Sequence, residues 1–241
     1  LFVVAMNTTA QNRSINFEQV KEWKKIIKKA KKEKKLIFLD CYTSWCGPCK
    51  LLARDVFTKD EVADFFNARF VNVKFDMEKG EGKELSKKFD IHAYPTFLIV
   101  RTDGTVQHKL TGSSDLEGFI ERVQKGLEEE NTLPYQHQLY AKGEMSKQQL
   151  LAYKECLSEA NDKEKAAQIY NELLEQLSDS DKMQKEFWGI YEDRSCQIGT
   201  PLFNYLLSNL TSIRENVGAE KVDNYLFPKY QKALNDYIRG F

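Results

Sequence analysis

Hydrophobic and polar positions follow two different patterns along the 241-residue chain, and the pattern changes near residue 131. Before that point, short apolar runs predict four β-strands, at residues 36–42, 70–75, 96–101 and 105–110. Apolar residues at helical spacing predict helices at residues 17–34, 48–57, 60–68, 83–89 and 115–130. Asp103-Gly104 joins the last two runs and is typical of a β-hairpin turn. This order of strands and helices predicts an α/β fold, a mixed sheet with helices on both sides.

After residue 131 no segment has the character of a strand, and an all-α domain is predicted. Helices are expected at residues 146–159, 162–177, 181–196, 201–211 and, as one or two helices, 218–238. Ser146, Asp162 and Asp181 are suitable N-caps, and Thr200-Pro201 places a proline in a first helical turn. A bundle and a tetratricopeptide-like array fit this pattern equally well. Several aromatic residues recur at helical spacing and are interpreted as core: Tyr153, Tyr170, Phe187, Trp188, Tyr191 and Tyr205.

We therefore expect two domains, at residues 11–131 and 132–241, preceded by a distinct segment at residues 1–10. The apolar run from Leu1 to Met6, followed by Thr8-Thr9-Ala10, is similar to the end of a secretory signal peptide. A first strand is the alternative. A signal would make the protein exported, periplasmic or attached to the membrane on that side; without one, it is cytoplasmic. No apolar run approaches the ~20 residues that a membrane-spanning helix needs.

Charge narrows the choice of partners. The 36 basic and 36 acidic residues give zero formal net charge, which argues against nucleic acid as the main partner. One lysine-rich stretch, residues 21–35, carries apolar residues at helical spacing, so we interpret it as the solvated face of an amphipathic helix. Docking on a membrane surface or an acidic partner is the less favoured interpretation.

The candidate chemistry lies in Cys46-Gly47-Pro48-Cys49, directly after the first predicted strand. Pro48 suits a first helical turn, so Cys46 is expected at a helix N-terminus, where the dipole favours a thiolate and lowers the thiol pKa. Cys49 lies one helical turn further on and can attack a mixed disulfide formed at Cys46. The pair therefore predicts thiol–disulfide exchange, with a nucleophilic and a resolving thiol.

A zinc site is the competing interpretation of two cysteines at this spacing, and it needs two further ligands. The remaining cysteines, Cys41, Cys156 and Cys196, form no second pair of this kind, and the three histidines are scattered, so no metal is predicted. Cys41 is expected to be buried in the first strand. Cys156 and Cys196 lie in predicted helices, and the sequence leaves open whether they pair.

The residues from Trp45 to Lys50 resemble the active-site motif of thioredoxins. Further matches follow in the same order along the chain: Asp40, Lys74, Tyr94-Pro95-Thr96 and Gly112. Residues 55–62 are more similar to the periplasmic thioredoxin-like domains of DsbD-type thiol reductases than to small cytosolic thioredoxins. The similarity covers residues 17–127, and residues beyond it resemble no family that we can name.

The resemblance implies a thioredoxin-like fold and assigns roles to these positions. Asp40 would accept the proton of Cys49, with Lys74 as its partner, because a carboxyl group in apolar surroundings has a raised pKa. Trp45 would shield the cysteines and contact substrate, although packing alone also explains it. Pro95, if cis, would bring the Tyr94 backbone beside Cys46, where an extended substrate could add as a strand.

Gly47 and Pro48 complete the implied substrate-binding set and resemble the reducing members of the family. The resemblance therefore implies a reductase of protein disulfides that needs no cofactor beyond the Cys46–Cys49 disulfide and is reduced by an upstream thiol electron donor. An isomerase or oxidase with the same site is the first alternative. The second is a partner-binding protein in which the helical domain has the main role. In either case, a protein partner on the helical domain is expected.

Overall fold

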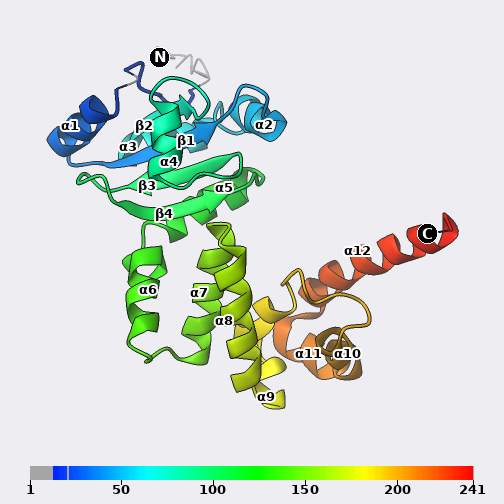
Figure 1. The fold of residues 1–241 in the computed structure, drawn as a ribbon. Helices are drawn as coiled ribbons and strands as arrows, with labels where there is room; N and C mark the ends of the chain where they lie inside the picture. Colours follow the sequence, from blue (N-terminus) through cyan, green and yellow to red (C-terminus); the bar gives the residue numbers. More distant parts are fainter. Residues whose placement is uncertain (1–12, 21, 241) are drawn as a thin grey trace, which may run out of the picture. The chain divides into compact units, whose positions relative to one another are not determined.

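The computed structural model describes residues 13–20 and 22–240, which form two compact units (Figure 1). Unit 1 runs up to Gln138 and includes Cys156–Asp162; unit 2 comprises Leu139–Glu155 and Lys163 onward. The domain boundary expected between residues 131 and 132 stays a prediction. The predicted signal-peptide remnant, residues 1–10, lies outside the described residues.

Unit 1 is built on a mixed four-stranded sheet in the order β2-β1-β3-β4. Strand β1 (Leu36–Tyr42) is parallel to β2 (Phe70–Asp76) and antiparallel to β3 (Thr96–Val100), which forms the expected hairpin with β4 (Val106–Thr111). Gly104 has φ of +89° in the hairpin turn, a conformation that favours glycine. The predicted α/β fold is confirmed.

Helices cover both faces of this sheet (Figure 1). They are α1 (Trp23–Glu33), α2 (Gly47–Asp55), α3 (Asp60–Arg69), α4 (Gly82–Lys88) and α5 (Leu116–Lys125), followed by a 3-10 turn, η1 (Glu129–Asn131). One apolar core lies between the sheet and α1 and α4; the other, rich in phenylalanine, lies between the sheet and α2, α3 and α5. Phe38 of β1 is central to the second core, with ring centroids 4.6 Å from Phe66 and 5.6 Å from Phe97.

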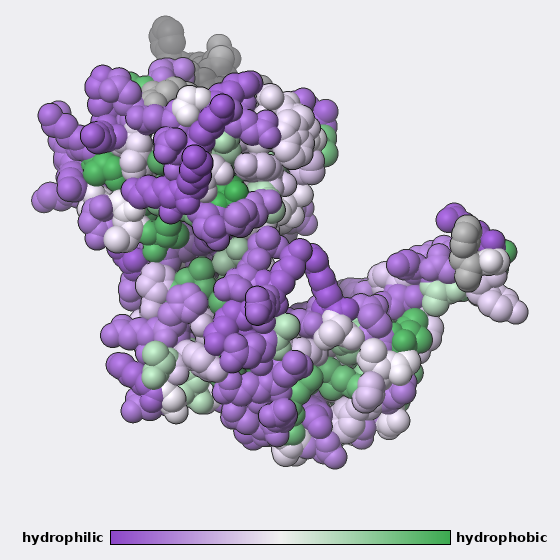
Figure 2. Space-filling view, viewed as in Figure 1, coloured by the Kyte–Doolittle hydropathy of each residue, from purple (hydrophilic) through white to green (hydrophobic). Residues whose placement is uncertain are grey.

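The start of the first helix was predicted wrongly. Phe17 forms a parallel bridge with Asn72, and the Glu18 N–H donates to the Asn72 carbonyl at 2.8 Å. This segment is therefore extended beside β2, and α1 begins only at Trp23. The helix is amphipathic as expected: Trp23, Ile26 and Ala30 are buried, and polar side chains dominate the surface around it in Figure 2. Lys59 holds the N-cap position of α3, and the side chain of Asp60, the first residue of that helix, accepts the Arg13 N–H.

Helix α5 ends five residues earlier than predicted, because its end approaches β4 closely. A Cβ atom at Gly126 would lie 2.5 Å from the His108 ring, so only glycine fits there. The Gln107 side-chain amide donates to the Gly126 carbonyl at 2.9 Å, which satisfies a group left free by the helix end. The hydrophobic pattern continues past Gly126, but the contact with His108 requires glycine there, and glycine is a poor helix former.

The second half is all-α, as predicted. Its helices are α6 (Leu133–Ala141), α7 (Lys147–Glu159), α8 (Lys163–Gln176), α9 (Asp179–Lys182), α10 (Pro201–Ser208), α11 (Leu210–Val217) and α12 (Ala219–Ile238), with a 3-10 helix, η2 (Lys185–Ile190). Helix α6 was not predicted. The core interpretation of the aromatic residues is confirmed for five of them, which are buried, whereas Tyr205 is half-buried.

The single helix predicted at residues 181–196 is wrong. Ser178 is the N-cap of the short α9, and Asp181 completes a capping box instead of starting the helix. Beyond α9, the Tyr191 hydroxyl donates to the Lys182 carbonyl and the buried Tyr170 hydroxyl to the Ile190 carbonyl. Long-range bonds of this kind hold the segment in tight turns that local periodicity does not reveal. Ser146 and Thr200 do cap their helices, as expected.

Candidate functional site

The cysteine pair lies where β1 leads into α2. The Cys46 N–H donates to the Thr43 carbonyl at 3.2 Å, which closes the turn between strand and helix. Pro48 lies in the first turn of α2, where its missing N–H leaves no bond unmade. Cys46 and Cys49 form a disulfide with a Cα–Cα distance of 5.4 Å. One helical turn thus sets the spacing that the bond requires.

Cys46 occupies the N-cap position of α2, as the sequence predicted. Its Sγ accepts a hydrogen bond from the Cys49 N–H at 3.2 Å, so the helix N-terminus points at this sulfur. A thiolate formed there on reduction would meet the positive end of the helix dipole. In the disulfide form both sulfurs are shielded from water: Cys46 is 2% exposed and Cys49 is 8% exposed. The Cys46 side chain turns back onto the first turn of its own helix instead of facing water.

An aromatic pair lies beside the disulfide. Trp45 is 62% exposed, and its ring meets the half-buried Tyr94 edge to face at 5.8 Å. The Tyr94–Pro95 peptide bond is cis, and the Pro95 carbonyl accepts the Gly112 N–H at 2.9 Å. Gly47 and Pro48 are exposed at the start of α2.

Glu78 is a part of the site that sequence reasoning missed. Its carboxylate accepts the Trp45 indole N–H at 3.0 Å to each oxygen and so fixes the ring. Glu78 follows β2 just as Trp45 follows β1. Because the two strands are parallel, their carboxyl ends reach the same edge of the sheet, and this topology is the signal that could have found the contact.

Asp40 and Lys74 occupy facing positions on β1 and β2. Asp40 is 6% exposed and shares the parity of Phe38, so it lies on the sheet face that α2, α3 and α5 cover. The Lys74 ammonium lies 5.1 Å from the Phe17 ring centroid. Burial, with the neighbouring Asp40 charge, raises the pKa of the Cys41 thiol well above its usual range. The structure thus gathers Cys46, Cys49 and the Asp40–Lys74 pair into one region, while their roles stay predictions.

The other candidate groups lie apart from this region. Cys41, Cys156 and Cys196 are buried free thiols, so Cys156 and Cys196 do not pair. His92 is exposed and bonds Asp90 at 2.6 Å. Among residues 13–20 and 22–240, no group of three or more His, Cys, Asp or Glu side chains could hold a metal ion. Within the same described residues, no helix combines the length and apolar character needed to cross a membrane.

Known proteins resemble this chain mainly over unit 1. The thioredoxin family model matches residues 14–125. Over 94 residues the chain is 37% identical to thioredoxin H-type of Oryza sativa subsp. indica, covering 38% of this chain and 71% of that protein. It is 24% identical over 122 residues to the thiol:disulfide interchange protein DsbD of Pseudomonas fluorescens, covering 49% of this chain and 21% of that protein. A solution structure described as a disulphide-isomerase from Bacteroides thetaiotaomicron is 47% identical, with a TM-score of 0.46, covering 49% of this chain and 98% of that one.

The fold and the site define a protein with a thioredoxin-like domain and a Cys-Gly-Pro-Cys disulfide at a helix N-terminus, the arrangement of thiol–disulfide oxidoreductases. The chain is also 37% identical to a thioredoxin over 71% of that protein's length, and this identity shows common ancestry. The chain belongs to the thioredoxin family. It spans about a fifth of the length of some curated relatives that it matches, DsbD among them.

Proposed function

We propose that this protein is a thiol–disulfide oxidoreductase that reduces protein disulfides through Cys46 and Cys49. The observation that carries the proposal is the Cys46 sulfur at the N-cap of α2, accepting the Cys49 N–H and already bonded to the Cys49 sulfur. The same atoms that close the disulfide would stabilise the Cys46 thiolate once it is reduced.

The reaction starts from the reduced pair. The Cys46 thiolate attacks one sulfur of a substrate disulfide, forming a bond between enzyme and substrate while the other substrate sulfur leaves as a thiolate and takes a proton. Cys49 then loses its proton and attacks the Cys46 sulfur. The Cys46–Cys49 disulfide forms, and the second substrate sulfur leaves as a thiol. The substrate gains two electrons, and an upstream dithiol donor restores them to the enzyme.

In this proposal Asp40 accepts the proton that Cys49 loses, and Lys74 positions the carboxylate. Support comes from the burial of Asp40, from its place on the sheet face that α2 covers, and from the facing register of the two residues. A carboxylate in such surroundings suits proton transfer near neutral pH.

Substrate binding is assigned to the surface around the disulfide. Trp45, held by Glu78 and Tyr94, would provide an exposed aromatic contact, and Gly47 and Pro48 leave the helix start open to an approaching chain. An extended substrate segment would lie along the Tyr94-Pro95 backbone, adding main-chain hydrogen bonds in the manner of an extra strand.

The proposal also specifies the direction of the reaction, which is reduction of the substrate disulfide. Gly47-Pro48 resembles reducing family members, so a reduction potential of about −270 mV is expected, against about −120 mV for a strong oxidant. Titration of the Cys46–Cys49 pair against glutathione or dithiothreitol couples measures it directly. A value near −120 mV would favour an oxidase. An insulin reduction assay separates the enzyme from a partner-binding protein, which would leave insulin unreduced.

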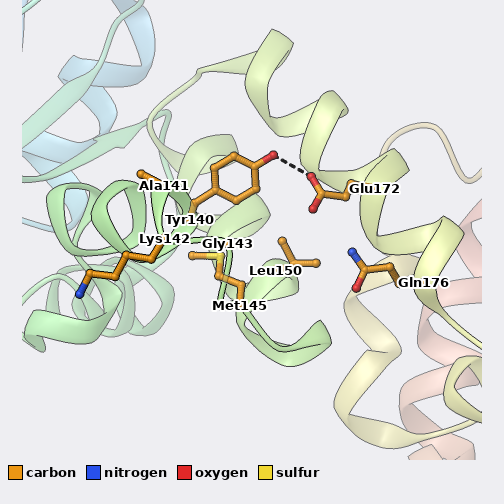
Figure 3. A pocket seen from close by; sticks show the side chains of 8 residues that line it. All are labelled: Tyr140, Ala141, Lys142, Gly143, Met145, Leu150, Glu172 and Gln176. Carbon is orange, nitrogen blue, oxygen red and sulfur yellow. Dashed lines mark hydrogen bonds between the residues drawn. The ribbon is translucent and has the colours of Figure 1, made fainter.

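Unit 2 is proposed to recruit a protein partner or substrate. It contains a cavity of about 550 Å³ between α6, α7 and α8, within the size range of ligand pockets (Figure 3). Met145 and Leu150 give it an apolar wall, and the Glu172 carboxylate, which accepts the Tyr140 hydroxyl at 2.7 Å, gives it an anionic one. This chemistry suits a long basic side chain of a protein, whose stem is apolar and whose head pairs with a carboxylate.

Trapping tests this recruitment. The Cys49→Ser variant should hold substrates as mixed disulfides, and adding Glu172→Lys should reduce the set of proteins held without changing insulin reduction in the Cys49-containing chain. An unchanged set would show that the cavity has no part in substrate choice.

For localisation we propose export, supported by the pattern of residues 1–10, with the cytoplasm as the alternative. Fractionation of cells that express the gene decides between them.

A further inference from the structure

The last part of α12 carries a continuous apolar face that its own unit leaves uncovered. Its anchored part ends where the Lys229 ammonium donates to the Cys196 carbonyl at 3.1 Å and Tyr230 meets the Phe203 ring at 6.2 Å. Beyond that point α12 projects away from α10 and α11 (Figure 1). Five large side chains form what we call the α12 seam, two at the end of the anchored part and three beyond it. They are 44–82% exposed: Phe227, Tyr230, Leu234, Tyr237 and Ile238.

The seam has the spacing of a helix-pairing surface. From Phe227 to Tyr237 the intervals are three, four and three residues, the alternation of a heptad, and Ile238 lies one turn after Leu234. At about 100° per residue, all five side chains fall within an arc of roughly 100° on the helix. The opposite side carries Lys232 and Asp236, and no charged residue lies within the arc. Figure 2 shows apolar and polar residues side by side along this projection.

We propose that the seam pairs with the seam of a second copy of this chain, in an antiparallel arrangement about a two-fold axis. The residues beside the seam, Gln231 and Ala233, are neutral, so self-pairing places no like charges opposite each other. The two-fold axis passes between Tyr230 and Leu234, so Phe227 of one copy lies near Tyr237 and Ile238 of the other. The pairing covers both faces at once, because an isologous interface uses the same patch twice.

The size of the seam sets the strength of this dimer. An aromatic side chain can bury about 150–250 Å², and the exposed fractions of the five residues give roughly 500–700 Å² of apolar surface per copy. Stable interfaces bury about 800 Å² per partner, so the seam lies at the lower end of specific association. The dimer should therefore form reversibly, with a dissociation constant in roughly the micromolar range.

Sedimentation velocity on the full chain from 1 to 300 µM tests the proposal. A monomer–dimer equilibrium is expected, and Leu234→Glu should weaken it at least about 100-fold, because each dimer contains the substitution twice at its centre. Lys232→Glu, on the opposite side of the same helix, should leave the equilibrium within about twofold of the wild type. Far-UV circular dichroism should match for all three proteins, since Leu234 lies beyond the last anchoring contact of α12. Tyr237→Glu provides a second disruption of the seam.

Three results would overturn the inference. A single monomeric species up to 300 µM would show that no second copy covers the seam. A dimer that survives both Leu234→Glu and Tyr237→Glu would place self-association on another surface. Binding of the monomer to vesicles of phosphatidylglycerol, lost in Leu234→Glu, would make the seam a membrane-surface helix instead.

Discussion

Glu159, at the end of α7, provides the sharpest test of how unit 1 is held together. Its carboxylate accepts from the Arg122 Nε at 3.1 Å and contacts the His108 Nε2 at 3.3 Å, so one side chain joins α7 to α5 and to β4. The carboxylate is 23% exposed, whereas His108 is almost fully buried. Glu159→Gln keeps the shape of the side chain but removes the charge that both partners face.

The expected cost follows from these contacts. Removing a hydrogen-bonded partner from a charged group costs about 1.5–3 kcal/mol, and glutamine can still accept one of the two bonds. Allowing for the partial exposure of the pair, we expect Glu159→Gln to lower the free energy of unfolding by about 1–3 kcal/mol at pH 7. The matched control is Glu121→Gln on α5, an exposed glutamate, for which a change below about 0.5 kcal/mol is expected.

The effect should depend on pH in a defined direction. Burial alone would raise the pKa of Glu159, but the hydrogen bond with His108 and the charge of Arg122 outweigh it. The pKa of Glu159 is therefore lowered in the folded protein. A carboxyl group whose folded pKa lies below its unfolded value, about 4.3, stabilises the fold fully above that value. Its contribution is lost as the pH falls through the folded pKa. The difference between wild type and Glu159→Gln should therefore be full at pH 7 and shrink below about pH 4.

Urea denaturation at pH 7.5, 5.0 and 3.5, followed by far-UV circular dichroism, measures the difference. If the two units unfold in separate transitions, the transition that Glu159→Gln shifts to lower urea should be that of unit 1, and it should coincide with faster reduction of the Cys46–Cys49 disulfide. Equal stability of Glu159→Gln and wild type at pH 7.5 would refute the reasoning. So would a difference that persists undiminished at pH 3.5.

The remaining predictions concern the site and the division of the chain. Cys46→Ser should abolish insulin reduction while Cys49→Ser accumulates mixed disulfides, seen on non-reducing gels; full activity in both would exclude this pair as the active site. Asp40→Asn should slow mixed-disulfide resolution by about 10²-fold in stopped-flow fluorescence with the fold intact, and an unchanged rate from pH 6 to 8 would leave Asp40 a structural role. A chain ending at Asn131 should reduce small disulfides but unfold at lower urea than Glu159→Gln, because it lacks all of Cys156–Asp162; higher stability would contradict the packing described here.

Local pattern was enough to predict the four strands and the hairpin that joins the last two. The β1 segment is apolar at both parities because it is buried on both faces, and the Asp103-Gly104 hairpin depends on a two-residue preference. Where a distant contact decided the structure, the pattern failed. Bonding of Glu18 to Asn72 keeps the segment before α1 extended. The packing of His108 requires glycine at position 126, just past the end of α5, although the apolar spacing continues.

The site shows the same division. The placement of Cys46 at a helix N-terminus followed from one proline and one strand, both local. Burial of its side chain, the Trp45–Glu78 bond and the Glu159 contacts each depend on which segments the fold brings together. Hydrophobic periodicity alone does not predict such contacts, because the residues that make them lie 33 to 51 positions apart in the sequence.

The three buried thiols affect how many cysteines of the folded protein react with a thiol reagent. Burial raises the pKa of Cys156 to about 12 and also raises the pKa values of Cys41 and Cys196. At pH 7 a thiol with a pKa of about 12 is ionised in only about one molecule in 10⁵, and the thiolate is the reacting form. Because all three thiols are buried, the folded chain should show no reactive thiol when oxidised and two when reduced. Unfolding adds the three buried thiols, which gives three in the oxidised chain and five in the reduced chain. A colorimetric thiol count without denaturant thus doubles as a gauge of folded fraction.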